Sequence, residues 1–312
     1  MKIDDKSIKQ MMMFGQSTSM LGLCLPGLIE SHPEIMVITA DQAYPAGLDS
    51  FKAKYPDHFL NAGIAEQNMI GMAAGIAETG KRVICVAQAC FITMRAYEPI
   101  RQFCGYMGVP LILVGISSGF GLTMMGNTHY ALEDIALMRT IPNMAIACPA
   151  NPIEAVTALE EALVHDGPVY IRLNGMKETQ LAPNLNNENC ILTDGTDVNI
   201  ISTGSMVKNS LEAVNILKEK GISARLFNAR TVRPLNPDAI DLDIPMTVTV
   251  EEHRKTGGLG DAVADVLSPY GAKLVKIAVE NDYPTPGSYS YLLEQSGLMP
   301  DQIAERIIKT IR

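Results

Sequence analysis

Residues 61–80, NAGIAEQNMIGMAAGIAETG, place small and apolar side chains closely around one carboxylate, Glu66. A carboxylate near a helix N-terminus is commonly no more than a favourable partner for the helix dipole. Most of its neighbours, however, are small enough to let another backbone come very close. They are Gly63, Ala65, Gly71, Ala73, Ala74 and Gly75. We therefore expect Glu66 to face another surface rather than water, where its carboxyl group could hold or share a proton.

The composition is that of a mildly acidic globular protein. The chain has 312 residues, of which 47% are hydrophobic and 19% are charged, and its net charge is -9. At roughly 100–200 residues per domain, this length predicts about two domains. Because nucleic acid attracts basic surfaces, the acidic balance predicts no nucleic-acid partner.

The cysteines and the N-terminus bear on the compartment. Six cysteines are scattered without a Cys-x-x-Cys pair, which favours free thiols in a reducing compartment. They are Cys24, Cys85, Cys90, Cys104, Cys148 and Cys190. The first residues, MKIDDKSIKQMMMFG, lack a signal-peptide pattern, and no stretch approaches the ~20 apolar residues of a membrane span. We expect a cytoplasmic protein without membrane attachment.

Short apolar runs alternate with helical patterns in the first part of the chain. The candidate strands are IMVITA (35–40), RVICVAQ (82–88), PLILVGIS (110–117), MAIACP (144–149) and VYIRL (169–173). Residues 151–167, NPIEAVTALEEALVHDG, have a helical pattern. Near-continuous apolar strands separated by helices are typical of a parallel sheet covered on both faces, so the predicted fold class is α/β.

The alternation restarts after a polar, Asn-rich segment at residues 175–190. The further candidate strands are VNIIST (198–203), ARLFNA (224–229), MTVTVEE (246–252) and LVKIAV (274–279), with helices expected at 205–221 and 257–271. We predict a first domain over residues 1–180, a linker over 181–192 and a second domain over 193–312. Each domain is expected to be a mostly parallel sheet covered by helices.

Several motifs carry a resemblance to a known family. GIAEQNMIGMAAGIA (63–77) resembles the glutamate motif of the pyrimidine-binding domain in thiamine-diphosphate enzymes of the transketolase and 1-deoxyxylulose-5-phosphate synthase group. The likeness extends through ACFITMRAYEPIR (89–101), residues 126–155 and GPVYIRLN (167–174). LFNARTVRPLNPDAI (226–240) and EEHRKTGGLGDAVADVL (251–267) resemble the transketolase C-terminal domain. The motifs cover nearly the whole chain in the family's order.

The resemblance implies a cofactor, thiamine diphosphate, and a role for Glu66. In this family the corresponding glutamate exchanges a proton with N1′ of the cofactor's aminopyrimidine, and the activated cofactor adds to the carbonyl of a ketose or 2-oxo acid. The cofactor supplies the electron sink, while the protein supplies orientation and one buried acid. Glu66 is therefore the first predicted catalytic residue.

FITMRAY places Phe91, Met94 and Tyr97 at helical spacing, which puts them on one face. Without the resemblance, core packing is the simpler explanation. The resemblance implies that Phe91 stacks on the pyrimidine ring, and that Met94 and Tyr97 form further parts of the ring's wall. Pro99 is expected to kink or end this helix.

The resemblance also points to substrate-facing residues. His129, in GNTHYALED, falls on a histidine that contacts substrate hydroxyls or transfers a proton. Ser117 and Met125 stand where the family usually has a histidine and an aspartate. The family's phosphate-binding arginine falls on Gly175, although Arg172 is nearby and is a candidate substrate contact. We therefore do not expect the ordinary pentose and hexose phosphates.

The family's cation-binding motif, Gly-Asp-Gly followed by an asparagine, has no match here. The nearest stretch, GDAVADVL (260–267), lacks the second glycine and lies in the likeness to the C-terminal domain. No metal ligand is predicted in this chain. We expect Mg2+ or a similar divalent cation, together with the diphosphate, to be held mainly by a separate N-terminal transketolase subunit. Two copies of each chain would form a heterotetramer that is active on a small sugar substrate.

Other functions fit the same residues. A 2-oxo acid dehydrogenase E1 beta-type subunit has the same two-domain plan and would release CO2 from a 2-oxo acid. An enzyme similar to deoxyxylulose-phosphate synthase would join pyruvate to an aldehyde. A non-catalytic degenerate subunit is the third alternative, and the residues that favour it are Ser117, Met125 and Gly175.

Overall fold

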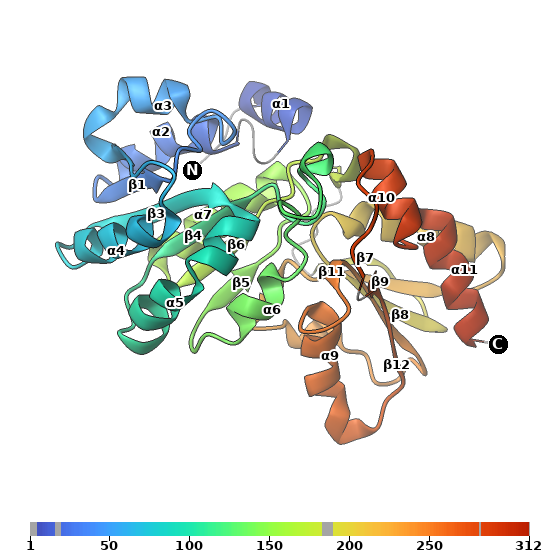
Figure 1. The fold of residues 1–312 in the computed structure, drawn as a ribbon. Coiled ribbons are helices and arrows are strands. Elements are labelled where there is room, and N and C mark those ends of the chain that lie inside the picture. The colour runs from blue at the N-terminus through green and yellow to red at the C-terminus, as the bar shows by residue number, and fades with distance from the viewer. Residues whose placement is uncertain (1–4, 16–19, 183–189, 281, 312) are drawn as a thin grey trace.

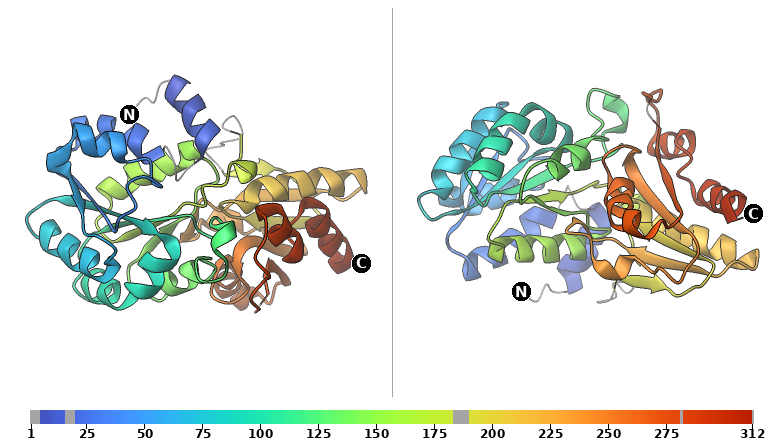
Figure 2. Two further views of the ribbon diagram at one scale, coloured as in Figure 1. Left: turned by 45° about the horizontal axis from the view of Figure 1, so that its top comes forward. Right: turned by 90° about the horizontal axis from the view of Figure 1, so that it is seen from below.

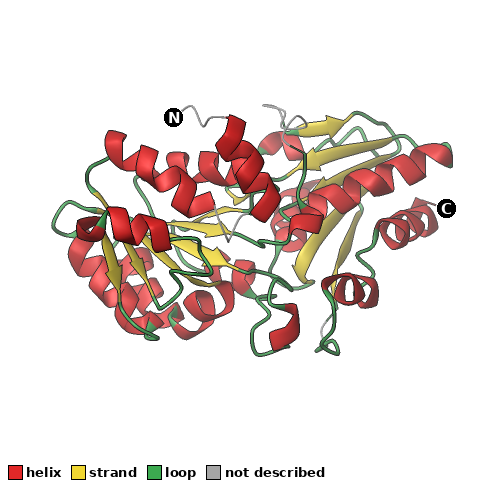
Figure 3. Ribbon diagram, turned by 90° about the horizontal axis from the view of Figure 1, so that it is seen from above, coloured by secondary structure: helices red, strands yellow, loops and turns green. Residues whose placement is uncertain are grey.

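The chain forms two β-sheets that lie side by side, each packed against helices (Figures 1 and 3). The structure, a computed structural model, describes residues 5–15, 20–182, 190–280 and 282–311. No helix in these ranges is both long and apolar enough to cross a membrane. The predicted α/β class is confirmed.

The first sheet has seven strands in the order β10-β5-β6-β4-β3-β1-β2. Their bounds are Ile35–Thr39 (β1), Phe59–Asn61 (β2), Arg82–Gln88 (β3), Ile112–Ile116 (β4), Ala145–Ala147 (β5), Val169–Arg172 (β6) and Thr231–Arg233 (β10). The strands from β5 to β2 are parallel, and β10 pairs with β5 antiparallel. The central strands are buried along almost their whole length, because helices cover both faces of the sheet.

The two faces of the first sheet have different helices. One face packs against α1 (Asp5–Phe14), α2 (Leu21–Ser31), α3 (Asp49–Lys54) and α7 (Pro152–Val164). The other packs against α4 (Glu66–Ala77), α5 (Tyr97–Ile100), α6 (Asp134–Arg139) and two π-helical turns, Phe91–Arg95 and Arg101–Tyr106. This second group of helices, from α4 to α6, contains most of the predicted site residues.

The second sheet has five strands in the order β12-β11-β8-β9-β7, with β7 antiparallel to β9. Their bounds are Ile191–Thr193 (β7), Val198–Ser202 (β8), Ala224–Asn228 (β9), Thr247–Arg254 (β11) and Leu274–Val279 (β12). One face packs against α8 (Met206–Glu219), α10 (Tyr289–Gln295) and α11 (Pro300–Ile311), and the other against α9 (Leu259–Leu267). Helices α8, α10 and α11 lie at the end of the molecule opposite the blue N-terminal helices (Figure 2).

One buried apolar cluster spans both sheets. Strand β10 follows β9 in the chain but pairs with β5 at the edge of the first sheet. A single buried cluster contains Ile146 of the first sheet together with Ile201 and Phe227 of the second. The two halves are therefore joined by a continuous apolar interior as well as by the chain itself.

The long predicted elements are confirmed, and three short strands are additions. Strands β2, β7 and β10 have three residues each, too few to show a pattern in sequence. From the sequence, Pro99 is expected to kink or end its helix. The helical segment does not end at Pro99, because it continues to Tyr106, but the backbone departs from helical geometry at Ala96, three residues earlier (φ -95°, ψ 14°). Pro99 lies in the first turn of α5, where a missing backbone N–H removes no helical hydrogen bond.

The predicted domain limits stay a prediction, since residues 183–189 of the predicted linker lie outside the described residues. All six cysteines are free, as predicted, and all are buried.

Glu252 connects the two halves through its buried carboxylate. One oxygen accepts a hydrogen bond from the backbone N–H of Phe120 at 2.5 Å, and Asn174 donates to both oxygens. From the second half, the hydroxyls of Tyr289, at 2.6 Å, and Ser205 donate to the same carboxylate. Burial raises its pKa, and the positive charge of Arg172 and the hydrogen bonds from Ser205, Tyr289 and Phe120 oppose the shift.

The two residues beside Glu252 in β11 are also buried. Glu251 accepts the backbone N–H groups of Leu259 and Gly260 at the start of α9, and burial raises its pKa to about 7. His253 donates from Nδ1 to the Arg254 carbonyl at 2.7 Å and accepts at Nε2 from the Ala136 N–H. Burial lowers the pKa of His253 to about 4, so the folded chain holds a neutral imidazole.

The neutral His253 predicts a specific acid sensitivity. Between pH 6.5 and about 4 the unfolded chain binds a proton at this residue and the folded chain does not, so stability falls as the pH falls. Relative to His253→Gln, we expect the unfolding free energy of the wild type to fall by roughly 1.4 kcal/mol per pH unit in this window. Urea denaturation at several pH values measures the difference. His165→Gln, at an exposed histidine, is the control, and parallel pH profiles for the wild type and His253→Gln would contradict the assignment.

Candidate active site

The predicted catalytic and cofactor residues follow the carboxyl ends of parallel strands in the first sheet. Glu66 opens α4 shortly after β2, Phe91 follows β3, and His129 lies between β4 and α6. In open α/β sheets, ligands bind outside these strand ends. The fold therefore gathers three residues that are far apart in sequence.

Glu66 is a buried carboxylate with one charged partner. Its side chain is 3% exposed, and Oε2 accepts a hydrogen bond from Arg95 Nη1 at 2.9 Å. The Arg95 side chain is 48% exposed, so the pair extends from the interior to the surface. The expected burial of Glu66 is thus observed, and the ion pair offsets part of the cost of desolvating the charge.

Arg95 also covers the ring of Phe91. Its guanidinium carbon lies 4.3 Å from the ring centroid, within the range of a cation–π contact. The ring of His129 packs against Phe91 from another direction, with centroids 5.2 Å apart and planes at 67°. Glu66, Phe91, Arg95 and His129 therefore form one cluster.

Arg95 is not among the site residues predicted from the sequence. A half-exposed arginine in a helical segment ordinarily points into solvent, which hides its role. The available signal was its position four residues after Phe91 in FITMRAY, a spacing that brings side chains together on a helix.

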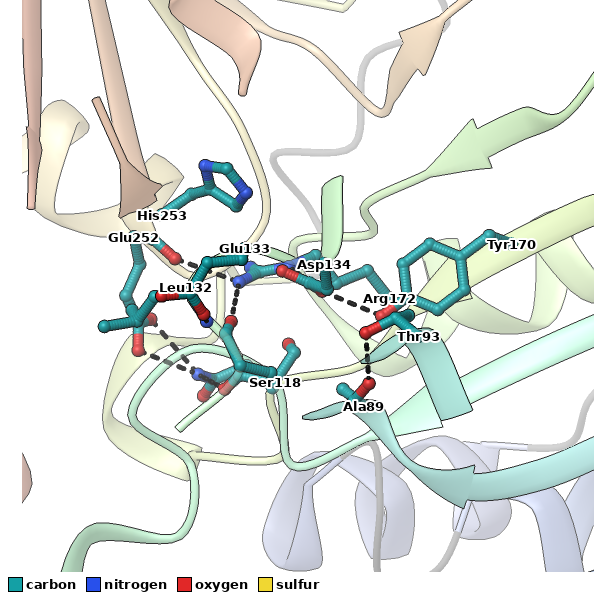
Figure 4. Close-up of polar contacts among 12 residues, drawn as sticks. Ala89, Thr93, Ser118, Leu132, Glu133, Asp134, Tyr170, Arg172, Glu252 and His253 are labelled. Carbon is teal, nitrogen blue, oxygen red and sulfur yellow. Dashed lines mark hydrogen bonds and ion pairs between the residues drawn. The ribbon is translucent and has the colours of Figure 1, made fainter. Parts of the chain in front are cut away.

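A π-helical turn, Phe91–Arg95, holds Phe91 and Arg95 in place. The buried hydroxyl of Thr93 donates to the carbonyl of Ala89 at 2.6 Å and ties the turn to the end of β3 (Figure 4). Such π turns occur mostly within longer helices and often at functional sites.

Met94 and Tyr97 line a neighbouring cavity of about 490 Å³, together with Thr128 and Tyr283. Met94 is 40% exposed, and the Tyr97 hydroxyl lies 2.7 Å from the Thr140 hydroxyl. The structure therefore brings Met94 and Tyr97 together on the cavity. Their predicted contact with a cofactor stays a prediction.

The loop that carries His129 is held by both halves of the molecule. Its backbone N–H donates to the Gly126 carbonyl at 2.9 Å, and the neighbouring Asn127 side chain donates to the Pro284 carbonyl at 2.9 Å. The Thr128 hydroxyl lies 2.9 Å from His129 Nδ1. The position of His129 thus depends on the second half as well as on the first sheet.

Arg172 is buried, with 4% of its surface exposed, and Figure 4 shows its polar contacts with Asp134 and its neighbours. Its Nε donates to Asp134 at 2.7 Å, and Nη2 donates to the carbonyls of Ala131 and Glu252. Tyr170 donates to the same Asp134 oxygen. These partners give Arg172 a structural role, and its predicted contact with substrate has no support from its surroundings.

The cluster around Glu66 has the chemistry that an aminopyrimidine ring requires. Such a ring is flat and presents an N–C–N edge, and so does a guanidinium group. The Arg95 guanidinium contacts Glu66 by a hydrogen bond and Phe91 by its face. The carboxylate and the aromatic ring can therefore accommodate a planar nitrogen-rich group. No group of three His, Cys, Asp or Glu side chains that could hold a metal ion occurs in the described ranges.

Two family models match the chain. Residues 16–177 match the transketolase pyrimidine-binding domain, and residues 189–303 match the transketolase C-terminal domain. The chain belongs to the transketolase family. The resemblance stated from its motifs is confirmed.

Relatives within the transketolase family include separate subunits. A putative transketolase C-terminal section from Methanocaldococcus jannaschii is 35% identical over 93% of this chain and 95% of its own length. One subunit of an apulose-4-phosphate transketolase from Phocaeicola vulgatus is 30% identical over 91% of this chain and 94% of its own length. A solved structure described as a split gene transketolase, an inactive beta4 tetramer, is 34% identical with a TM-score of 0.80, and the match covers 95% of this chain and 98% of that one.

The buried ion pair predicts the result of removing Arg172. Arg172→Met leaves the Asp134 carboxylate inside the protein without its charged partner. We expect a loss of about 3–5 kcal/mol in the free energy of unfolding, measured by denaturant titration. Arg101→Met, at an exposed arginine, is the control and should change stability little. A small change for Arg172→Met would contradict the structural role and restore Arg172 as a candidate substrate contact.

Proposed function

We propose that this chain is one subunit of a thiamine-diphosphate-dependent transketolase that transfers a two-carbon ketol unit from a ketose donor to an aldose acceptor. The observation that carries the proposal is the buried carboxylate of Glu66 beside the ring of Phe91, at the carboxyl ends of parallel strands. A buried acid next to an aromatic face is what the aminopyrimidine of the cofactor requires.

The lengths of the relatives support a divided enzyme. The C-terminal section from M. jannaschii and the transketolase subunit from P. vulgatus are matched over nearly their whole length. The similar beta4 tetramer is described as inactive. By analogy, this chain requires a separate N-terminal subunit that carries the diphosphate and the divalent cation.

The predicted site residues divide between cofactor binding and substrate binding. Glu66 holds or accepts a proton at N1′ of the aminopyrimidine, Phe91 contacts the face of that ring, and Met94 and Tyr97 border it. His129 contacts substrate hydroxyls or moves a proton near them. When bound, thiamine diphosphate supplies the electron sink for the ketol unit. Arg172 has no role in binding substrate in this proposal.

One face of α4 is suitable for a partner. Gln67, Asn68 and Gly75 are exposed, Met72 is 36% exposed, and Ile64 just before the helix is 76% exposed. Glu66 begins the same helix but lies on its buried face with Met69 and Ile70, so a partner docked on the exposed face would cover the helix that carries the carboxylate. We propose a heterotetramer with two copies of each chain, and the buried free thiols fit a cytoplasmic setting.

The proposal predicts the effect of Glu66→Gln. With a candidate N-terminal subunit, Mg2+ and thiamine diphosphate present, we expect the variant to lose at least about 100-fold in ketol transfer, because the proton-exchanging carboxyl is gone. The assay follows aldose-dependent consumption of a panel of ketoses, with and without phosphate groups.

The matched control is Glu78→Gln, at an exposed glutamate just after α4. It should retain wild-type activity. Equal activity of Glu66→Gln and the wild type would refute the assignment of Glu66. Release of CO2 from a 2-oxo acid, or formation of a ketol from pyruvate and an aldehyde, would instead favour the other members of the wider enzyme group.

A further inference from the structure

Arg95 occupies the two surfaces that the proposed cofactor ring needs. Its guanidinium donates to Glu66 Oε2 at 2.9 Å and lies 4.3 Å from the centre of the Phe91 ring. Both contacts are made by one flat group with an N–C–N edge. The chain thus satisfies its own buried carboxylate and its own aromatic face.

We propose that Arg95 is a latch on the cofactor site: it stands in for the aminopyrimidine ring while the site is empty and must withdraw before the ring can bind. The inference rests on the proposed function. Two flat groups cannot stack on the same face of Phe91 at once, and the guanidinium of Arg95 covers one face of that ring. Binding of the ring therefore requires the guanidinium to leave.

The Arg95 side chain can move away from Glu66 and Phe91. Its side chain is 48% exposed, so the guanidinium can turn into solvent without crossing the core. Because one partner of this ion pair is about half-exposed, the pair is weaker than a fully buried one and is partly screened by salt. The latch is therefore strong enough to keep Glu66 paired in the empty site and weak enough for a tightly bound cofactor to displace.

The latch also explains how a buried carboxylate is tolerated in the chain alone. With Arg95 in place the Glu66 side chain is only 3% exposed, and Arg95 is its charged partner. A carboxylate that is removed from water without a donor or a charged partner is costly. Arg95 offsets that cost until the ring takes over the carboxylate. The same contact competes with the cofactor, so it lowers the apparent affinity.

The test measures thiamine diphosphate binding by calorimetry, with this chain, a candidate N-terminal subunit and Mg2+ present. The variants are Arg95→Met, which removes both contacts, and Arg95→Gln, which keeps a planar donor without the charge. Arg101→Met, at an exposed arginine in the same helical segment, is the control. Circular dichroism melts verify that each variant is folded.

We expect the dissociation constant to tighten about three- to tenfold for Arg95→Met, to tighten less for Arg95→Gln and to stay unchanged for Arg101→Met. Because salt screens the ion pair, the ratio between the wild type and Arg95→Met should shrink as NaCl is raised. Unchanged or weaker binding by folded Arg95→Met would overturn the latch. If no protein binds the cofactor, including the wild-type pair, the proposed function fails and the latch with it.

Discussion

The contact between the two halves of the structure depends on one desolvated carboxylate, Glu252. It is 1% exposed and accepts hydrogen bonds from the backbone of Phe120 and from Asn174 on one side, and from Ser205 and Tyr289 on the other. Removing water from a carboxylate is costly unless donors replace it, so both halves must supply those donors together. The requirement fixes how the two sheets meet. Even a methyl group at Gly119 would overlap this carboxylate.

The junction in turn positions the candidate site. The segment from Gly119 to Asp134 is held at both ends. Near its start the Phe120 N–H donates to Glu252, and at its end Asp134 pairs with the buried Arg172. His129 lies between these two contacts. Loop contacts to Pro284 add a further link to the second half. The contact of His129 with Phe91 therefore lies in a loop that both halves hold in place. None of the predicted site residues lies in the second half of the chain. Its contribution to the site is to hold the loop that carries His129.

Some parts of the fold and of the candidate site could be predicted from the sequence, and others could not, because tertiary contacts determine them. The longer parallel strands are apolar over their whole length, because both faces are covered, and that pattern is visible in RVICVAQ and PLILVGIS. Strand β10 could not be predicted from the sequence, because three residues are too few to show a period and its partner, β5, is distant in the chain. Glu66 stood out because small residues surround it. Arg95 and Glu252 did not, because charged residues are usually solvated and their partners are set by tertiary contacts. Arg172 was placed in the site by its neighbours in sequence, while its guanidinium turned out to belong to the interior.

The central claim is that this chain contributes half of a thiamine-diphosphate site and that a second subunit completes it. The most direct measurement is calorimetric titration of thiamine diphosphate with Mg2+ into this chain, into a candidate N-terminal subunit and into their mixture. The account predicts tight binding by the mixture, with one cofactor for each copy of this chain, and weak or undetectable binding by either chain alone. Equally tight binding by this chain alone, or no binding by a mixture whose subunits demonstrably associate, would contradict it.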